Sequence, residues 1–125
     1  QINKRAKKIA RFDAGDWWGQ CWGDSATAIV AFGSTIGPAR EAARRLAAAG
    51  RPVRVVGLRV LSPLPTEQLA SALQGVRRVI VVEQNHGAQL YHYLLGQKAI
   101  PFAAESVARP GPLPYRPSEI ASYVA

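Results

Sequence analysis

A chain of 125 residues that is 48% hydrophobic can bury one core, and it is too short for two domains of ordinary size. No apolar run approaches the roughly 20 residues of a membrane-spanning helix, which excludes a helical membrane protein. The net charge of +8 is compatible with a nucleic-acid partner, because basic surfaces attract phosphate backbones.

The basic residues are unevenly distributed, since five of the 16 Lys and Arg residues lie within the first eleven positions. Aromatic residues do not interleave with this segment as base-stacking platforms would, which argues against nucleic acid. We interpret residues 1–15 as a basic linker or the end of an upstream element, followed by a single domain over residues 16–125. The chain has no initiating Met and no apolar signal-peptide core, so we expect it to be a piece of a longer protein.

All three tryptophans fall within residues 17–22, WWGQCW. Loose alternation there predicts a short edge strand or hairpin that lays aromatic surface over the core. A patch facing a partner protein is the alternative interpretation. The single cysteine, Cys21, can form neither an internal disulfide nor a metal cluster. This favours a reducing cytoplasm and a half-buried apolar role for the thiol.

The central part of the sequence predicts a β-α-β unit. Ala26 to Phe32 is an uncharged apolar run, typical of a strand covered on both faces of a parallel sheet. Gly33 to Gly37 then turns the chain, and Pro38 suits the first position of a helix with alanines and Leu46 on one face. Gly50 is placed to end that helix before a second β-branched strand, Val53 to Val60. A right-handed crossover joins such parallel strands.

Strands and helices continue to alternate toward the C-terminus. A helix that starts after Pro65 and ends at Gly75 precedes a third strand, Val76 to Glu83. A helix then packs Ala88, Tyr91, Leu94 and Leu95 on the sheet, followed by a fourth parallel strand over 102–107, a proline-rich loop over 109–116, and a last helix from Pro117. This order predicts an α/β fold, a three-layer α/β/α sandwich with a mostly parallel sheet of four to five strands.

Two loops lie where a ligand of such a sheet would bind. Ligands gather beyond the carboxyl ends of the strands, at a point where the strand order reverses. The loops Gly33 to Gly37 and Glu83 to Gly87 both follow strands and precede helices, so they offer helix amides to an anion. The first loop predicts a tight turn with a hydroxyl cap before it predicts a ligand. The candidate residues of these binding or interface loops are Gly33, Ser34, Thr35, Gly37, Glu83, Asn85, His86 and Gln89.

Catalytic and metal-binding patterns are absent from the sequence. His86 and His92 lack metal-ligand spacing with other His, Cys or carboxylate residues. We also find no carboxylate pair, nucleophile elbow or thiol dyad. We therefore predict no catalytic residue and no metal site in this chain.

Four motifs, taken together and in order, carry a resemblance to a known family. The chain resembles the C-terminal domain of the α subunit of 2-oxoacid:ferredoxin oxidoreductases, and it is similar to the C-terminal domains of transketolase and of the β chain of pyruvate dehydrogenase. The motifs are Gly33–Pro38, Leu58–Pro65, Val82–Asn85 with Gln89–Leu90, and Gly111–Tyr115 with Glu119–Ile120. One departure stands out, because the family usually has glycine immediately before Gln89 and this chain has Ala88. We expect a change of turn shape there.

The resemblance implies a mixed sheet in which residues 17–22 form one antiparallel edge strand. It also implies a complex that decarboxylates a 2-oxoacid with thiamine diphosphate, passes electrons through iron–sulfur clusters to ferredoxin, and gives the acyl group to coenzyme A. The diphosphate cofactor lies between the pyrimidine-binding domain of the α subunit and the β subunit. We therefore expect a cytoplasmic structural and assembly domain that binds no cofactor and is inactive alone. Its partners would be the rest of the α subunit, the β subunit and ferredoxin.

A second hypothesis comes from a different class of protein. The chain could be a stand-alone α/β binding module that uses the strand-end edge for a phosphate-bearing ligand or its basic end for nucleic acid. The salt dependence of binding distinguishes the two hypotheses. Nucleic-acid binding weakens steeply as the salt concentration rises, whereas binding through a tryptophan-centred protein interface does not.

Overall fold

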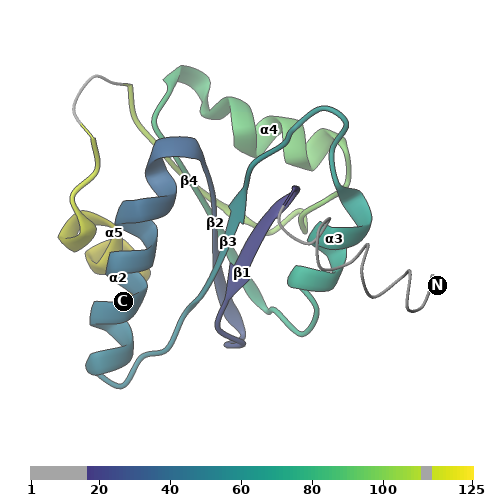
Figure 1. Cartoon of the computed structure of the whole chain (residues 1–125). Coiled ribbons are helices and arrows are strands. Elements are labelled where there is room, and N and C mark those ends of the chain that lie inside the picture. The colour runs from purple at the N-terminus through teal and green to yellow at the C-terminus, as the bar shows by residue number, and fades with distance from the viewer. Residues whose placement is uncertain (1–16, 111–113) are drawn as a thin grey trace.

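The structure, a computed structural model, describes residues 17–110 and 114–125 of the chain (Figure 1). Its strands are β1 (Gly19–Trp22), β2 (Thr27–Phe32), β3 (Arg54–Leu58), β4 (Arg78–Glu83) and β5 (Glu105–Ala108). Its helices are α2 (Ile36–Ala48), α3 (Thr66–Ala72), α4 (Gln89–Gly96) and α5 (Pro117–Val124), with short 3-10 turns η1 (Gly33–Thr35) and η2 (His86–Ala88).

The five strands form one sheet in the order β1-β3-β2-β4-β5. Strand β2 lies at its centre, parallel to β3 on one side and to β4 on the other, and β5 continues parallel to β4. Strand β1 pairs antiparallel with β3, from Gly19 opposite Leu58 to Trp22 opposite Val55. The predicted mostly parallel sheet with an antiparallel edge strand is therefore confirmed.

Helices cover both faces of the sheet, which gives the three predicted layers. Helices α2 and α5 lie on one face, and α3 and α4 lie on the other (Figure 1). Alternate residues of the central strand pack against the two helical layers, because successive side chains of a strand point to opposite faces of the sheet. Ile29 packs in the cluster that includes Leu46 of α2 and Ile120 of α5, whereas Val30 packs in the cluster that includes Leu69 of α3 and Leu94 of α4.

The start of α2 and the buried face of α4 differ from the sequence prediction. Helix α2 begins at Ile36, so Pro38 is its third residue; the fold accepts proline there because the first amides of a helix have no partner within it. The face of α4 buries Leu90 and Leu94, while Ala88 precedes the helix in a left-handed conformation. Ala88 was predicted on that face, and Leu90 was missed.

The fourth parallel strand is also shorter than predicted. Strand β5 begins at Glu105, and Phe102 lies before it in a turn closed by the Ala104 amide donating to the Pro101 carbonyl. Phe102 is 93% exposed. The apolar character of residues 102–104 suggested a strand, but these residues lack a ladder partner in the described sheet.

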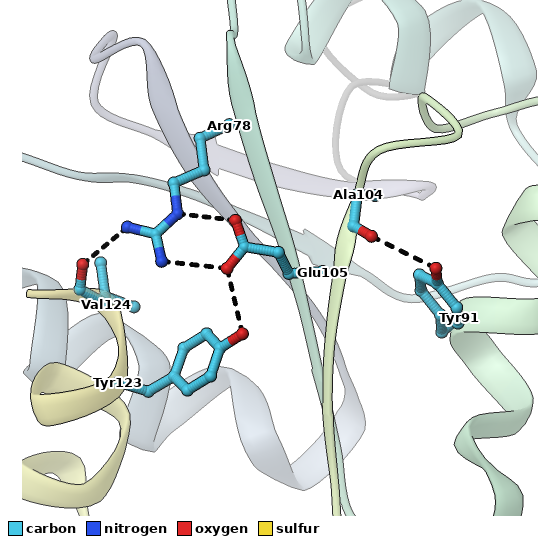
Figure 2. A network of polar contacts seen from close by, with 6 residues as sticks. All are labelled: Arg78, Tyr91, Ala104, Glu105, Tyr123 and Val124. Atoms are coloured by element: carbon cyan, nitrogen blue, oxygen red, sulfur yellow. Dashed lines mark hydrogen bonds and ion pairs between the residues drawn. The ribbon is translucent and has the colours of Figure 1, made fainter.

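A polar network joins α5 to the sheet (Figure 2). The Arg78 guanidinium donates to both carboxylate oxygens of Glu105 on the neighbouring strand, at 2.8 and 3.0 Å, and to the Val124 carbonyl at 2.7 Å. The Tyr123 hydroxyl donates to the same carboxylate at 3.0 Å. These bonds, led by those from Arg78, hold the pKa of Glu105 below its ordinary value. The network fixes the end of α5 against the start of β4.

In the described part of the chain, no helix is both long enough and apolar enough to cross a membrane.

Candidate functional site: a cleft at the carboxyl ends of the strands

The topology creates a crevice between the ends of β2 and β4. These two strands are neighbours in the sheet, but the helices that follow them lie on opposite faces, α2 on one and α4 on the other (Figure 1). The loops after the two strands therefore diverge. Open α/β sheets bind ligands at such a switch point, beyond the carboxyl ends of the strands.

A cleft of about 650 Å³ opens at this crevice. Its size lies in the range of ligand sites and of recesses at domain boundaries. The loops after β2, β3 and β4 and the first two turns of α4 form its walls. The lining residues are Phe32, Gly33, Ser34, Thr35, Leu61, Ser62, Glu83, Gln84, Asn85, Gln89, Leu90 and Tyr93.

Six of the eight candidate residues line this cleft. They are Gly33, Ser34, Thr35, Glu83, Asn85 and Gln89. Gly37 lies in the first turn of α2, away from the lining, and the side chain of His86 falls outside the described part of the structure. The loop after β3 was missed. The position of Leu61 and Ser62 could have revealed this loop, because it follows a predicted strand just as the other two loops do.

Glu83 is the most constrained side chain of the cleft, with 4% of its surface exposed. One carboxylate oxygen accepts the Leu90 amide at 2.6 Å and the Asn85 side-chain amide at 2.9 Å, and the other accepts the Tyr91 amide at 2.9 Å. The Leu90 and Tyr91 amides belong to the first turn of α4. Backbone N–H groups in the first turn of a helix have no hydrogen-bond partner within the helix. Glu83 thus supplies the negative charge that a helix N-terminus favours.

The turn between Glu83 and α4 is held by Asn85. Its side-chain oxygen accepts the Gln89 amide at 3.2 Å while its nitrogen donates to Glu83. Two consecutive residues of this turn have positive φ, Gly87 at 73° and Ala88 at 51°. The left-handed conformation of Ala88 is unfavourable for a residue with a Cβ. The expected change of turn shape relative to the family stays a prediction, and the structure shows Ala88 itself in the left-handed region.

The loop after β2 is closed by a different bond from the one predicted. The Thr35 hydroxyl donates to the Phe32 carbonyl at 2.9 Å and makes no cap on α2. The hydroxyl cap predicted for this loop is therefore wrong. Thr35 is buried, whereas Phe32 and Ser34 on the rim are exposed. The loops after β2 and β4 therefore differ. The Glu83 carboxylate accepts the first amides of α4, whereas no side chain caps α2.

Two tyrosines hold in place the elements that surround the cleft. The Tyr93 hydroxyl of α4 donates to the Leu61 carbonyl at 2.6 Å, which joins the loop after β3 to the helix after β4. The buried Tyr115 hydroxyl donates to the Glu83 carbonyl at 3.2 Å, and its pKa is raised by burial. The Arg109 guanidinium lies 4.2 Å from the centre of the Tyr115 ring and donates to both oxygens of Glu119. Tyr115 and Arg109 thereby support the end of β4.

The lining does not fit a diphosphate group. Among the described residues that form the cleft there is no Lys or Arg, and the acid Glu83 is bonded to three N–H groups of its own chain. A diphosphate needs cations or free helix amides. Iron–sulfur clusters need several cysteines, and the sequence has one, Cys21, whose thiol has a pKa raised by burial. Within residues 17–110 and 114–125, no cluster of His, Cys, Asp and Glu could hold a metal ion.

Comparison with known proteins places the fold in context. Residues 19–116 match the family described as transketolase, C-terminal domain. A 2-oxoacid:ferredoxin oxidoreductase 2, subunit alpha, from Aeropyrum pernix is 39% identical over 87 residues, which is 70% of this chain and 12% of the relative. A 1-deoxy-D-xylulose-5-phosphate synthase 1 from Geobacter metallireducens is 45% identical over 58 residues, which is 46% of this chain and 9% of the relative. The chain therefore spans about a tenth of these relatives.

Two solved structures share the fold. A 2-oxoglutarate:ferredoxin oxidoreductase from Magnetococcus marinus, solved with 2-oxoglutarate, coenzyme A and succinyl-CoA bound, matches 98% of this chain and 23% of its own, with a TM-score of 0.75 and 27% identity. A split-gene transketolase, described as an inactive beta4 tetramer, matches 85% of this chain and 39% of its own, with a TM-score of 0.63 and 22% identity. The second likeness concerns the fold alone.

Proposed function

The chain belongs to the transketolase C-terminal domain family, and on this premise we propose that it is the C-terminal domain of the α subunit of a 2-oxoacid:ferredoxin oxidoreductase. The observation that carries the proposal is the 39% identity over 87 residues to the α subunit of such an enzyme. The match of 98% of the chain to the Magnetococcus marinus enzyme supports it. The four motifs that carry the resemblance extend from Gly33 to Ile120 and so cover most of the domain.

We assign the domain a structural and assembly role within that enzyme. The strand-end residues are bonded mainly to one another, as the contacts of Glu83 with α4 and of Tyr93 with Leu61 illustrate. Because the hydrogen-bonding groups of these residues are already used within the chain, the strand-end edge suits a rigid surface better than a reactive site. Glu83 and Asn85 order the loop after β4, and the loop over 33–37 forms the opposite rim.

The proposed complete enzyme is cytoplasmic and depends on thiamine diphosphate. It converts a 2-oxoacid to acyl-CoA and reduces ferredoxin through iron–sulfur clusters. The family resemblance implies that the pyrimidine-binding part of the α subunit and the β subunit hold this cofactor, and a cleft lining that does not suit the diphosphate supports this proposal. By the same reasoning the domain is inactive alone, and its partners are the rest of the α subunit, the β subunit and ferredoxin.

A synthase of 1-deoxy-D-xylulose 5-phosphate is the second candidate. The 45% identity to such an enzyme favours it, but over only 58 residues, which is 46% of the chain. The stand-alone module for a phosphate ligand receives less support from the geometry, because neither Lys nor Arg occurs in the described lining of the cleft.

The test is to express the complete polypeptide that contains residues 1–125 together with its β subunit. With thiamine diphosphate and coenzyme A present, we expect pyruvate or 2-oxoglutarate to reduce ferredoxin. Deletion of residues 17–125 should abolish both the activity and co-purification of the β subunit. Formation of 1-deoxy-D-xylulose 5-phosphate without ferredoxin reduction would favour the second candidate and overturn the first.

A further inference from the structure

We infer that the carboxyl edge of the sheet, formed by the cleft together with Trp17 and Phe32, is the surface on which the preceding domain of the same polypeptide packs. The inference rests on the proposed function, since it needs a longer polypeptide with a domain ahead of this one. We call this surface the carboxyl-edge surface. Three observations carry the inference: the direction of β1, the uncharged lining of the cleft, and the exposed aromatic side chains beside it.

The direction of β1 places the first described residues at this edge. Because β1 is antiparallel to β3, its first residue, Gly19, lies opposite Leu58 at the carboxyl end of β3. The Arg59 amide donates to the Trp18 carbonyl at 2.8 Å, so the chain still follows β3 beyond the ladder. A parallel first strand would have started at the opposite edge. The described part of the chain therefore begins at this edge, beside the end of β3.

The chemistry of the cleft suits a protein surface. Interface centres are depleted of charge and enriched in aromatic residues. The described lining includes Phe32, Leu61, Leu90 and Tyr93, and its acid, Glu83, is already bonded within the chain. A charged ligand would find no counter-charge among these residues. A neighbouring domain could place apolar side chains between the loops and form hydrogen bonds with Ser34 and Gln89 on the rim.

Exposed aromatic residues extend the same surface across three strands. Phe32 ends β2 and pairs with Leu58, which in turn pairs with Gly19, so Phe32 and Trp17 flank the end of β3. Their exposed fractions are 41% and 40%. Clustered exposed apolar groups indicate an interaction site, whereas single ones are ordinary. Phe102, more exposed still, precedes β5 at the other edge of the sheet and offers a matched control.

The experiment measures hydrogen exchange in the complete polypeptide and in the chain of residues 1–125. We expect amides of residues 33–37, 61, 62 and 64 to exchange about tenfold more slowly in the complete polypeptide, because a packed domain reduces local opening. Phe32→Asp in the complete polypeptide should remove this protection. Phe102→Asp should leave it intact. Ser34→Arg, at an exposed rim position, gives a second disruptive variant if Phe32→Asp fails to fold.

Three results would overturn the inference. The first is equal exchange of these amides in the long and short chains. The second is protection that Phe102→Asp removes and Phe32→Asp does not, which would place the contact at the opposite edge. The third is protection that appears only when a small molecule such as coenzyme A is added, because a ligand would then occupy the cleft. Slow exchange without ferredoxin reduction would leave this inference standing and reject the proposed enzyme, so the two failures are distinguishable.

Discussion

At the scale of single residues, the cleft is organised by one buried acid. Glu83 ends β4 and accepts N–H groups from residues seven and eight positions further along, across the whole turn. Because buried polar groups need partners, the carboxylate and the first turn of α4 satisfy each other. The Asn85 side chain completes this arrangement. The role of Glu83 follows from this geometry: it holds the wall of the cleft in place.

Glu83→Gln should destabilise the chain by about 2 kcal/mol, because the new NH₂ group would face a backbone N–H donor. Urea unfolding of the two proteins measures the difference. Glu67→Gln is the matched control. Glu67 is an exposed acid in the first turn of α3, and its loss should cost about 0.5 kcal/mol or less. Equal effects of the two substitutions would contradict the structural role of Glu83.

Ala88→Gly should stabilise the chain by up to about 1 kcal/mol, because glycine adopts the left-handed conformation without the penalty of a Cβ. The φ of 51° at Ala88 is the observation behind this expectation. Thermal unfolding measures the shift, and Ala47→Gly on the exposed part of α2 should instead lower stability by about 1 kcal/mol. A loss of stability in Ala88→Gly would show that the turn is not strained.

At the scale of elements, the packing of α5 and of β1 depends on few contacts. Helix α5 has eight residues and is held by the Arg78–Glu105 pair, Tyr123 and its apolar face. Strand β1 has four residues at the edge of the sheet and touches β3 so closely that only glycine fits at position 19. Each contact joins segments far apart in the sequence. Both elements are therefore sensitive to single substitutions.

The contribution of Glu105 should depend on pH. Hydrogen bonds from Arg78, the largest cause, and from Tyr123 lower the pKa of Glu105 in the folded chain. The stabilisation is thus complete above the unfolded pKa of about 4.3 and is lost as pH falls through the lower folded pKa. The pair is partly exposed, so solvent screening limits the effect to about 1 kcal/mol.

Urea unfolding of wild-type and Glu105→Gln proteins at pH 7 and pH 3 measures this contribution. We expect the two proteins to differ at pH 7, and the difference to shrink as pH falls through the lowered pKa of Glu105 in the folded chain. A constant difference across this range would show that the carboxylate charge is unimportant. Tyr123→Phe, which removes one donor to Glu105, should produce a smaller change in the same direction.

Gly19→Ala should disrupt the pairing of β1 with β3. A Cβ on Gly19 would lie 1.9 Å from the Gly57 carbonyl oxygen, and the φ of +147° is unfavourable for other residues. We expect a loss of about 2 kcal/mol or more, with faster exchange of β1 amides. Gly96→Ala, at a helical position with open space around it, should be neutral or slightly stabilising. Unchanged β1 exchange in Gly19→Ala would contradict the close approach.

At the scale of the whole molecule, the excess positive charge lies outside the lining of the cleft. The sequence has a net charge of +8, but the described residues that line the cleft include no Lys or Arg. Arg40, Arg44 and Arg45 lie along exposed positions of α2 instead. General attraction of anions by the chain is therefore expected only at low salt, where screening is weak.

Calorimetric titration of residues 1–125 with thiamine diphosphate should give no saturable heat at about 0.2 M salt, where Debye screening reduces nonspecific attraction. Coenzyme A should behave in the same way. Weak heat at low salt that disappears as salt is added agrees with this expectation. Saturable heat at the higher salt that is lost in Ser34→Glu would show that the cleft binds the cofactor.

The local sequence determined the main elements and their order. The uncharged run over 26–32, the Gly50 stop and the proline before α3 depend on short-range preferences that a single strand or helix expresses by itself. The same reasoning found two of the three strand-end loops, because a loop that follows a parallel strand emerges at the carboxyl edge. The antiparallel edge strand came from the family resemblance.

Tertiary structure alone decided which residues act together. Arg54 lies in a run that the sequence identifies as an apolar strand, yet it is 7% exposed and donates to the carbonyls of Ala72, Gln74 and Asp24. Likewise, Glu83 meets Leu90 only because α4 folds back across the end of β4. These contacts join segments that have no local preference for one another. These hydrogen bonds stabilise the chain only once the sheet has brought the segments together. The periodicity and turn residues of the sequence therefore do not predict them.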